Sequence, residues 1–473
     1  MNSIYNGCYR FVDTSFAVVS ATVSSATKFI SSVACAAIDA SVDSAGWIVF
    51  REKYNRRKSL ITLAKTVADE QVTHIAFPTK GIGPAEVGDC VKCLKGTKVN
   101  SIVLAAHTID AVGALGFENL KDTEVRTVRL DSSYGPVLAR GFAKHLKNTQ
   151  VTTVDLSYNH IGSDGAREFV KSLKGTKVTT VNLMGNRIRD VGASDFAKHL
   201  KNTQVTTVDL SYNFIHSAGA RDCAKNLKGT KVTTVKLREN FILADGAREF
   251  AEHLKNTQVT AVDLSYNDIG SDGARDFVKN LKGTKVSTVR LRQTGIKDDG
   301  AKEFAEHLKD TQVTAVDLSC NHIGGDGARD FVKNLKGTHV TTVFLEGNTI
   351  SDHDLVELIR ELSGTQVKEL HVSGKPADSC YNRILSLIPL TNLIKLNVIG
   401  SKLPEALTVA CEENKRRLDR IEATRMFVES NLYKGPSRAY NDEINSVNDV
   451  LCYLPEEIRK RALNASMGTH NFS

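Results

Sequence analysis

A segment of eleven residues recurs along this chain at a constant spacing of 27 residues. Its clearest copy, VTTVDLSYNHI, runs from Val151 to Ile161, and further copies begin at Val178, Val205, Val232, Val259, Val286, Val313 and Val340. Weaker copies begin at Val72, Val99, Val125, Val367 and Leu393. About thirteen units at one fixed period predict a solenoid, in which each unit buries its apolar side against the next.

Two hydrophobic periodicities alternate within each unit. Val151, Val154 and Leu156 belong to a short β-branched run that predicts a strand. The residues that follow predict a helix with one apolar face and ordinary end signals: Ala166, Phe169, Val170 and Leu173 on the face, Ser163 or Asp164 at the start, and Gly175 at the end. Stacked units therefore predict a parallel sheet lined by helices on one side. Because helices are wider than the strand spacing, the sheet should curve with its strands on the inside.

An asparagine stands at the ninth position of most units, directly after the strand. In the clearest copy it is Asn159, and its side-chain amide is expected to bond backbone groups of neighbouring turns. The asparagine is replaced at Lys80, His107, Ser133 and Thr294, and looser turns are expected at these four positions.

The pattern LxxLxLxxN followed by IGxxGAxxxA, here with Val at most early Leu positions, resembles the leucine-rich-repeat family and its ribonuclease-inhibitor-like branch. The resemblance covers roughly residues 60–403. It implies an α/β horseshoe with a concave parallel β-sheet, convex helices and helical caps at both ends. The solenoid is expected at 59–403, after a helical N-terminal region at 1–58 and before a C-terminal helical cap and tail at 404–473. Because this family binds proteins on its concave face, the resemblance implies a protein-interaction scaffold.

The predicted concave face carries a column of mostly charged residues at the fifth position of the repeat. It reads Asp155, Asn182, Asp209, Lys236, Asp263, Arg290, Asp317 and Phe344. One interpretation is a self-neutralising ladder, at roughly 0.2–1 kcal/mol per pair. The other is a polar surface that recognises a partner. The two interpretations do not exclude each other.

A second column, at the eighth position, places Tyr158, Tyr212 and Tyr266 in every second unit before it ends at Cys320. Copying of a two-unit element explains this regularity without selection for binding. An exposed aromatic stripe nevertheless favours a partner-binding role, which we expect the tyrosines and the neighbouring charges to share. The helices also carry lysines near their C-termini, which either complement the helix dipoles or form a basic docking surface: Lys174, Lys201, Lys228 and Lys255.

The first 58 residues depart from the repeat. Phe16, Val19, Val23 and Ile30 belong to an apolar stripe at spacings of three and four, opposite Ser and Thr side chains. Such a helix is similar to lipid-packing sensors, and Trp47 and Phe50, followed by basic residues, would add a contact to an anionic membrane. Two interpretations stay open: a helical cap over the end of the solenoid, or a membrane-recruited tether.

The last 70 residues also depart from the repeat. The stretch from Glu405 to about Leu432 predicts a charged helix that caps the other end of the solenoid. The sequence LPEEIR at 454–459 resembles the opening of an F-box, which implies a ubiquitin-ligase adaptor as an alternative function.

Composition and motifs favour a binding protein over an enzyme. The formal charge of +8 arises from 62 basic residues interleaved with 54 acidic ones, so no nucleic-acid partner is predicted. Cys90 and Cys93 form one CxxC, but no second pair follows at zinc-site spacing, so no metal is predicted. The sequence contains no glycine-rich phosphate loop, metal-spaced histidine cluster or nucleophile elbow, so neither catalytic residues nor cofactors are predicted.

The cellular compartment of the protein and the kind of organism that makes it are predicted from less specific features of the sequence. Nine scattered cysteines and no visible signal peptide favour a monomer in the reducing cytoplasm. Near-identical tandem units and a Ser/Thr/Ala-rich N-terminus resemble the effectors that intracellular bacteria inject into host cells. That resemblance implies secretion into the host cell and a role in virulence.

Overall fold

The computed structural model describes residues 40–42, 47–50, 72–77, 88–89, 91–104, 116–130 and 135–432. The chain forms two compact units, residues 1–213 and residues 214–473. We call them the N-terminal unit and the C-terminal unit.

The N-terminal unit is a sheet with helices on one face. Its strands are β1 (Ala40–Val42), β2 (Trp47–Phe50), β3 (His74–Phe77), β4 (Ser101–Leu104), β5 (Thr127–Leu130), β6 (Thr153–Asp155), β7 (Thr180–Asn182) and β8 (Thr207–Asp209). Strands β2 to β8 pair in parallel, each with the next in sequence, and β1 is antiparallel to β2. The helices are η2 (Gly116–Asp122), α5 (Gly135–Lys144), α6 (Gly162–Ser172) and α7 (Arg189–His199).

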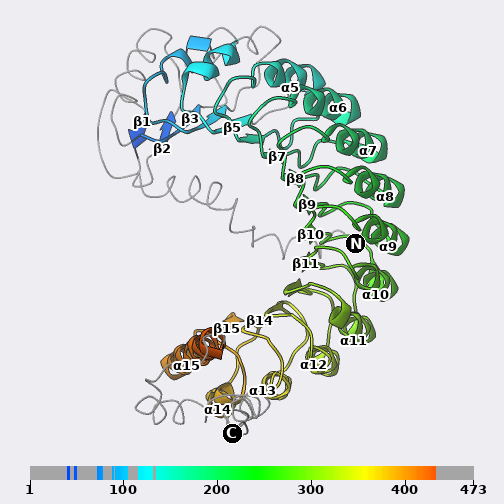
Figure 1. The fold of residues 1–473 in the computed structure, drawn as a ribbon, viewed down its shortest axis with the longest axis vertical. Coiled ribbons are helices and arrows are strands. Elements are labelled where there is room, and N and C mark those ends of the chain that lie inside the picture. The colour runs from blue at the N-terminus through cyan, green and yellow to red at the C-terminus, as the bar shows by residue number, and fades with distance from the viewer. Residues whose placement is uncertain are drawn as a thin grey trace, which may run out of the picture. The chain divides into compact units, whose positions relative to one another are not determined.

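The C-terminal unit repeats the same layering (Figure 1). Its strands are β9 (Thr234–Lys236), β10 (Ala261–Asp263), β11 (Thr288–Arg290), β12 (Ala315–Asp317), β13 (Thr342–Phe344), β14 (Glu369–Ser373) and β15 (Lys395–Ile399), all parallel and paired in order. Its helices are α8 (Ser217–Asn226), α9 (Ala244–His253), α10 (Gly270–Asn280), α11 (Asp298–His307), α12 (Gly325–Lys333), α13 (Asp352–Glu361), α14 (Asp378–Leu387) and α15 (Glu405–Leu432), with short 3-10 turns η3 (Leu308–Asp310) and η4 (Ile388–Leu390). In both units we call the helix-free side of the sheet the open face.

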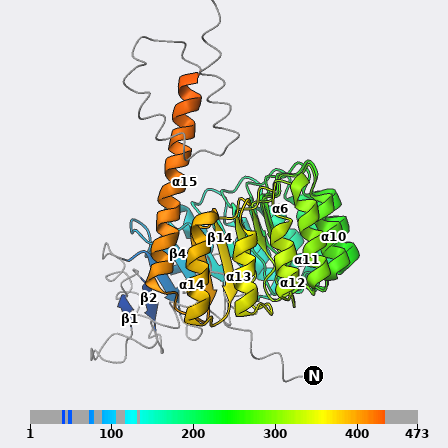
Figure 2. The same ribbon diagram turned by 90° about the horizontal axis from the view of Figure 1, so that it is seen from below.

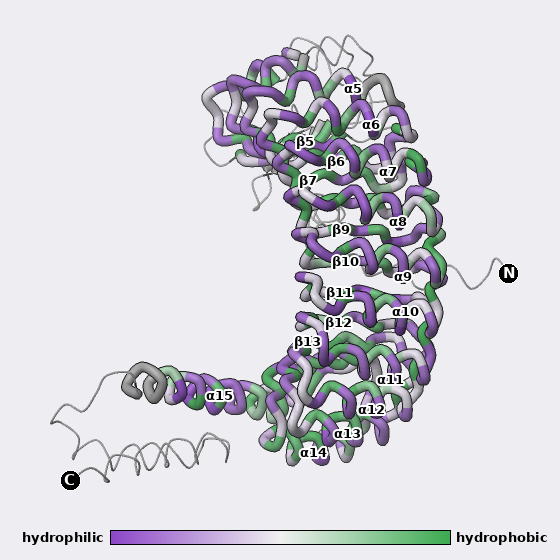
Figure 3. Tube along the Cα trace, turned by 45° about the vertical axis from the view of Figure 1, so that its right-hand side comes forward, coloured by the Kyte–Doolittle hydropathy of each residue, from purple (hydrophilic) through white to green (hydrophobic). Residues whose placement is uncertain are grey.

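The core lies between the sheet and the helices, where the sequence predicts it. Val154 and Phe169 are fully buried, and each unit presents the same positions to its neighbours. Every coil therefore alternates hydrophobic and hydrophilic residues (Figure 3). Burying one such side chain contributes about 1.5–3 kcal/mol, so the repeated column supplies most of the driving force. The phenylalanine column on the helices is interrupted at Cys223, which is buried in α8.

The turn asparagines form a buried ladder between repeats, as the sequence predicts. In the N-terminal unit, Asn186 Oδ1 accepts hydrogen bonds from the N–H groups of Asn159 (3.0 Å) and Ile161 (3.2 Å) in the preceding repeat. Its Nδ2 donates to Leu156 O at 2.7 Å. Asn213 Oδ1 accepts in the same way from Asn186 N–H at 2.9 Å. Each amide thus satisfies backbone groups that the turn geometry leaves without a partner of their own.

The prediction of a looser turn is wrong at Thr294. This residue is buried, and its Oγ1 donates to Leu291 O at 2.8 Å, replacing part of the amide's role. In the preceding turn, Ile269 N–H donates instead to Asn267 O at 2.9 Å, and Gly270 N–H donates to Thr294 O at 2.8 Å. The turn therefore rearranges its hydrogen bonds and keeps the repeat geometry. Lys80, His107 and Ser133 lie outside the described residues.

Helix α15 closes the sheet of the C-terminal unit with the bounds that the sequence predicts, and its later turns run away from the sheet (Figure 2). Asn414 is buried and its Nδ2 donates to Leu393 O at 2.7 Å and Thr391 O at 3.1 Å. Arg417 donates to Pro389 O at 2.6 Å and to Thr391 O at 2.7 Å. These side chains satisfy carbonyls that a following repeat would otherwise satisfy. None of the helices in the described part of the chain combines the length and apolar composition that crossing a bilayer requires.

At the other end, the predicted helical region at 1–58 contains two strands. Strand β1 pairs with β2, and β2 continues the sheet in parallel with β3, with Trp47 opposite His74. Trp47 and Phe50 therefore lie in a strand that covers the sheet edge, where helical spacing does not apply. Phe16, Val19, Val23 and Ile30 lie outside the described residues, as do the CxxC member Cys90 and the 454–459 segment.

Candidate protein-binding surface

The fifth-position aspartates are more buried than the sequence predicts. Asp155 and Asp263 keep only 5% and 9% of their surface exposed. Their Oδ1 atoms accept hydrogen bonds from the N–H groups of Ser157 (2.9 Å) and Ser265 (3.0 Å), two residues further on. The prediction that this position faces solvent is wrong for these residues, because the carboxylate turns back to satisfy the chain as it leaves a strand of only three residues.

Asp209 and Asp317 are half-buried and make the same hydrogen bond, to Ser211 at 3.0 Å and Ser319 at 2.9 Å. Burial raises the pKa of Asp317, against the hydrogen bonds from Ser319. The fifth-position aspartates therefore stabilise the strand ends through hydrogen bonds to the backbone. They contribute little negative charge to the exposed surface.

The adjacency of opposite charges along this column is confirmed by the strand register. In the C-terminal unit Asp263 pairs with Lys236 on one side and Arg290 on the other, and Arg290 pairs with Asp317. In the N-terminal unit, Arg129 Nε lies 3.8 Å from Asp155 Oδ2 on the next strand. Both observations favour the ladder interpretation for the aspartates.

The eighth-position tyrosines share one backbone conformation and differ in their surroundings. Tyr158, Tyr212 and Tyr266 have φ of 59°, 58° and 59°. Tyr158 is 54% exposed, and its ring lies against the backbone of the next repeat, where a Cβ on Gly185 would meet Tyr158 Cδ1 at 2.5 Å. Tyr212 and Tyr266 are half-buried. Tyr158 is thus the most exposed of the three tyrosines.

Tyr266 is the centre of a polar cluster that the sequence does not predict. The guanidinium carbon of Arg238, one repeat earlier, lies 4.2 Å from the centre of the Tyr266 ring. Arg292 Nε, one repeat later, donates to the Tyr266 hydroxyl at 3.2 Å, and Arg292 Nη1 lies 3.6 Å from Glu346 Oε2. Arg292 reaches Glu346 two repeats on because the seventh position between them is the small residue Ser319.

The cluster continues across the last strands of the C-terminal unit. His371 Nδ1 lies 3.8 Å from Glu346 Oε1, and its Nε2 lies 3.6 Å from Glu369 Oε2. Lys395 Nζ completes the row at 3.1 Å from Glu369 Oε2, and Phe344 stacks on His371 with ring centres 4.3 Å apart. We call Arg238, Tyr266, Arg292, Glu346, His371, Glu369 and Lys395 the open-face network.

Burial shifts the pKa values of two members of the open-face network. It raises the pKa of Glu346, with a further contribution from the negative charge of Asp317. It lowers the pKa of His371, and the positive charge of Lys395 acts in the same direction. Burial therefore favours the neutral form of His371, although two carboxylates lie nearby.

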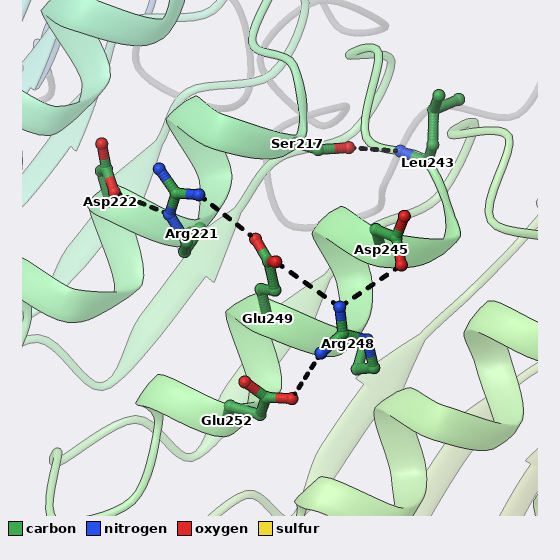
Figure 4. Close-up of polar contacts among 8 residues, drawn as sticks. All are labelled: Ser217, Arg221, Asp222, Leu243, Asp245, Arg248, Glu249 and Glu252. Atoms are coloured by element: carbon green, nitrogen blue, oxygen red, sulfur yellow. Dashed lines mark hydrogen bonds and ion pairs between the residues drawn. The ribbon is translucent and has the colours of Figure 1, made fainter.

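The outer helices carry ion pairs, both within one helix and between the helices of neighbouring repeats (Figure 4). Arg221 of α8 lies 3.6 Å from Glu249 of α9, and Arg248 contacts Asp245, Glu249 and Glu252 at 3.3, 3.5 and 2.8 Å. These side chains are substantially exposed, and such pairs contribute little because water screens them. They belong to the scaffold and show no sign of a site.

An exposed aromatic group is a second feature that the sequence interpretation missed. Phe214, Phe241 and Leu243 are 47%, 50% and 53% exposed, and the Phe241 ring stacks on Phe214 at 5.9 Å and on His216 at 5.4 Å. They occupy the tenth and twelfth positions of two adjacent repeats, where most other copies carry polar residues or glycine. Comparing the copies position by position would have revealed this departure.

Side chains that could ligate a metal ion are scattered over the described part of the chain. In this part of the chain, no three His, Cys, Asp or Glu side chains come together in a way that would hold a metal ion. A hollow of about 480 Å³ is lined by Gln312, Thr338, His339 and neighbouring polar residues, with neither a carboxylate nor a thiol beside the histidine. Burial raises the pKa of Cys223 to about 12, so its thiol is inert in the folded chain.

The described architecture is that of an α/β repeat solenoid, and comparison with known families identifies its repeats. Residues 147–170, 176–197, 255–278 and 309–332 match the leucine-rich-repeat family model. These four segments are therefore leucine-rich repeats, and the described residues have the α/β solenoid fold around them.

Among curated proteins, none matches the chain in sequence. One similar solved structure is actin-binding site 2 of leiomodin-1, at 20% identity over 38% of this chain and 96% of that one, with a TM-score of 0.27. A likeness of this size carries no argument about what this chain binds.

Proposed function

We propose that this chain is a non-enzymatic scaffold that binds a partner protein on the open face of its C-terminal unit. The open-face network is the observation that carries the proposal. It places arginine, tyrosine and histidine side chains on a sheet surface that none of the unit's described helices covers, and each is held by a neighbour.

The order of these side chains supports binding. Arginine and tyrosine dominate the energetics of protein interfaces because they combine large contact area with directional hydrogen bonds. Fixing a free, rotamer-rich side chain costs roughly 0.5–1.5 kcal/mol on association. Arg238 and Arg292 are already held against Tyr266 in the unbound chain. Binding a partner would therefore cost less side-chain entropy at these two residues.

The test is affinity capture from a eukaryotic cell lysate with the full chain. A variant carrying Tyr266→Ala and Arg292→Ala should lose a partner that the wild type retains. The matched control is Lys228→Ala with Lys282→Ala, two exposed lysines at the ends of outer helices in the same unit. Loss of the partner by the control alone would move the binding surface to the helices and overturn the proposal.

Finer assignments extend this proposal. The helices of nine to eleven residues in α6 to α12 support the ribonuclease-inhibitor-like type. We propose a monomeric effector of an intracellular bacterium that acts in the host cytoplasm, on the strength of its near-identical repeats. The membrane-tether and ubiquitin-ligase alternatives depend on residues outside the described part of the chain, or on β2, and stay predictions from the sequence.

A further inference from the structure

The open face of β9 to β12 carries both cations and anions. The cations are Lys236, Arg238, Arg290 and Arg292, all half-buried. The anions at the fifth position, Asp263 and Asp317, are already hydrogen-bonded to the backbone of the following serine. Glu239, at the eighth position, is half-buried and engaged in contacts of its own. The four cations outnumber these three anions, so this face carries an excess of positive charge.

Two of these cations have a fixed separation. Arg238 and Arg292 occupy the same repeat position two strands apart, on either side of Tyr266. Adjacent strands lie about 4.8 Å apart, so the two positions are separated by roughly 10 Å. A polyproline II segment advances about 3.1 Å per residue with three residues per turn, so side chains three residues apart lie on one face and match this separation.

We propose that the partner presents an acidic segment across these strands, with carboxylates three residues apart that bind Arg238 and Arg292. The intervening residues would lie over the Tyr266 ring. Paired arginines favour carboxylates because the guanidinium offers two parallel N–H donors to the two oxygens. This inference rests on the proposed function, since it names the chemistry of the partner at the same surface.

Glu346 supplies an internal comparison. Its carboxylate already lies 3.6 Å from Arg292, where an incoming carboxylate would have to compete with it. Removing the charge of Glu346 should therefore strengthen binding of an acidic segment, whereas removing the arginines should weaken it. A merely structural role for the network predicts no such opposite effects.

The experiment uses the full chain and a fluorescent ten-residue peptide with Glu at every third position and Gly and Ser between. Fluorescence anisotropy should show binding that falls at least fivefold in the Arg238→Ala, Arg292→Ala variant and rises severalfold in Glu346→Gln. A peptide of the same composition with its glutamates adjacent should bind more weakly. The Lys228→Ala, Lys282→Ala control removes equal charge from the outer helices and should bind as the wild type does. Circular dichroism confirms that each variant is folded.

Three outcomes would overturn the inference. They are equal losses in the arginine and lysine variants, no gain in Glu346→Gln, or displacement of the peptide by a ten-nucleotide oligothymidine at equal concentration. The last result would assign the surface to nucleic acid. If the peptide fails to bind while partner capture still depends on Tyr266, the acidic segment is wrong and the scaffold function stands.

Discussion

The asparagine ladder makes a quantitative prediction at Asn186. Replacing Asn186 by Ala removes the acceptor for the N–H groups of Asn159 and Ile161 and the donor to Leu156 O. Each buried backbone group left without a partner costs about 1–3 kcal/mol. Because Asn186 is fully buried and water reaches the turn poorly, we expect Asn186→Ala to lower the free energy of unfolding by about 2–5 kcal/mol.

A graded series tests this reasoning. Asn186→Thr should cost less than Asn186→Ala, because Thr294 shows that a threonine at this position still donates to a carbonyl of its own repeat. Ser172→Ala removes the hydrogen bond that Ser172 Oγ donates to Glu168 O within helix α6. It should change the free energy of unfolding by less than about 0.5 kcal/mol. Urea denaturation of the full chain, followed by circular dichroism, measures all three. Equal costs for the Asn186 and Ser172 variants would refute the account of the ladder.

Three further predictions concern single side chains. Gly185→Ala should destabilise by about 1–2 kcal/mol, because Gly185 has φ of +70° and the new Cβ meets the Tyr158 ring; adding Tyr158→Ala should recover part of the loss in thermal denaturation. His371 has a lowered pKa in the folded chain, so the unfolded chain takes up its proton first and stability should fall as the pH drops below about 6.5. His371→Asn should flatten that part of the profile. Cys223 should react with iodoacetamide only as fast as the chain unfolds, because burial raises the pKa of its thiol to about 12; fast labelling of the native chain would contradict this.

The fold could be predicted in detail from the sequence because the physical pattern is repeated. One copy of the strand and helix pattern is ambiguous, but many aligned copies identify the buried column from Val154 onwards and the turn role of Asn159. The bounds of α15 followed from a change of period alone. The strands β1 and β2 were missed because they have only three and four residues, and runs this short show no hydrophobic period of their own.

The candidate site was only partly predictable. Alternation along a strand places Asp155 outward, but the strand ends at that residue and the carboxylate turns to the N–H of Ser157. The contact of Arg292 with Glu346 depends on side-chain reach across a serine, and spacing alone does not reveal reach. Of the three tyrosines, Tyr266 joins the open-face network because arginines happen to flank it in the neighbouring repeats.

Large and small residues alternate at the seventh position of successive repeats, as Arg238, Ser265, Arg292, Ser319 and Glu346. This alternation limits how such a chain can change length during evolution. Any whole number of repeats preserves the asparagine ladder, since each amide bonds its own repeat and the one before it. Loss of a single repeat between Arg238 and Arg292 would instead bring two guanidinium groups onto adjacent strands, without the serine that separates them. Recombination between near-identical copies is therefore neutral for the surface only when repeats are gained or lost in pairs. The pattern of side chains on the binding face therefore has a period of two repeats, although the fold itself has a period of one.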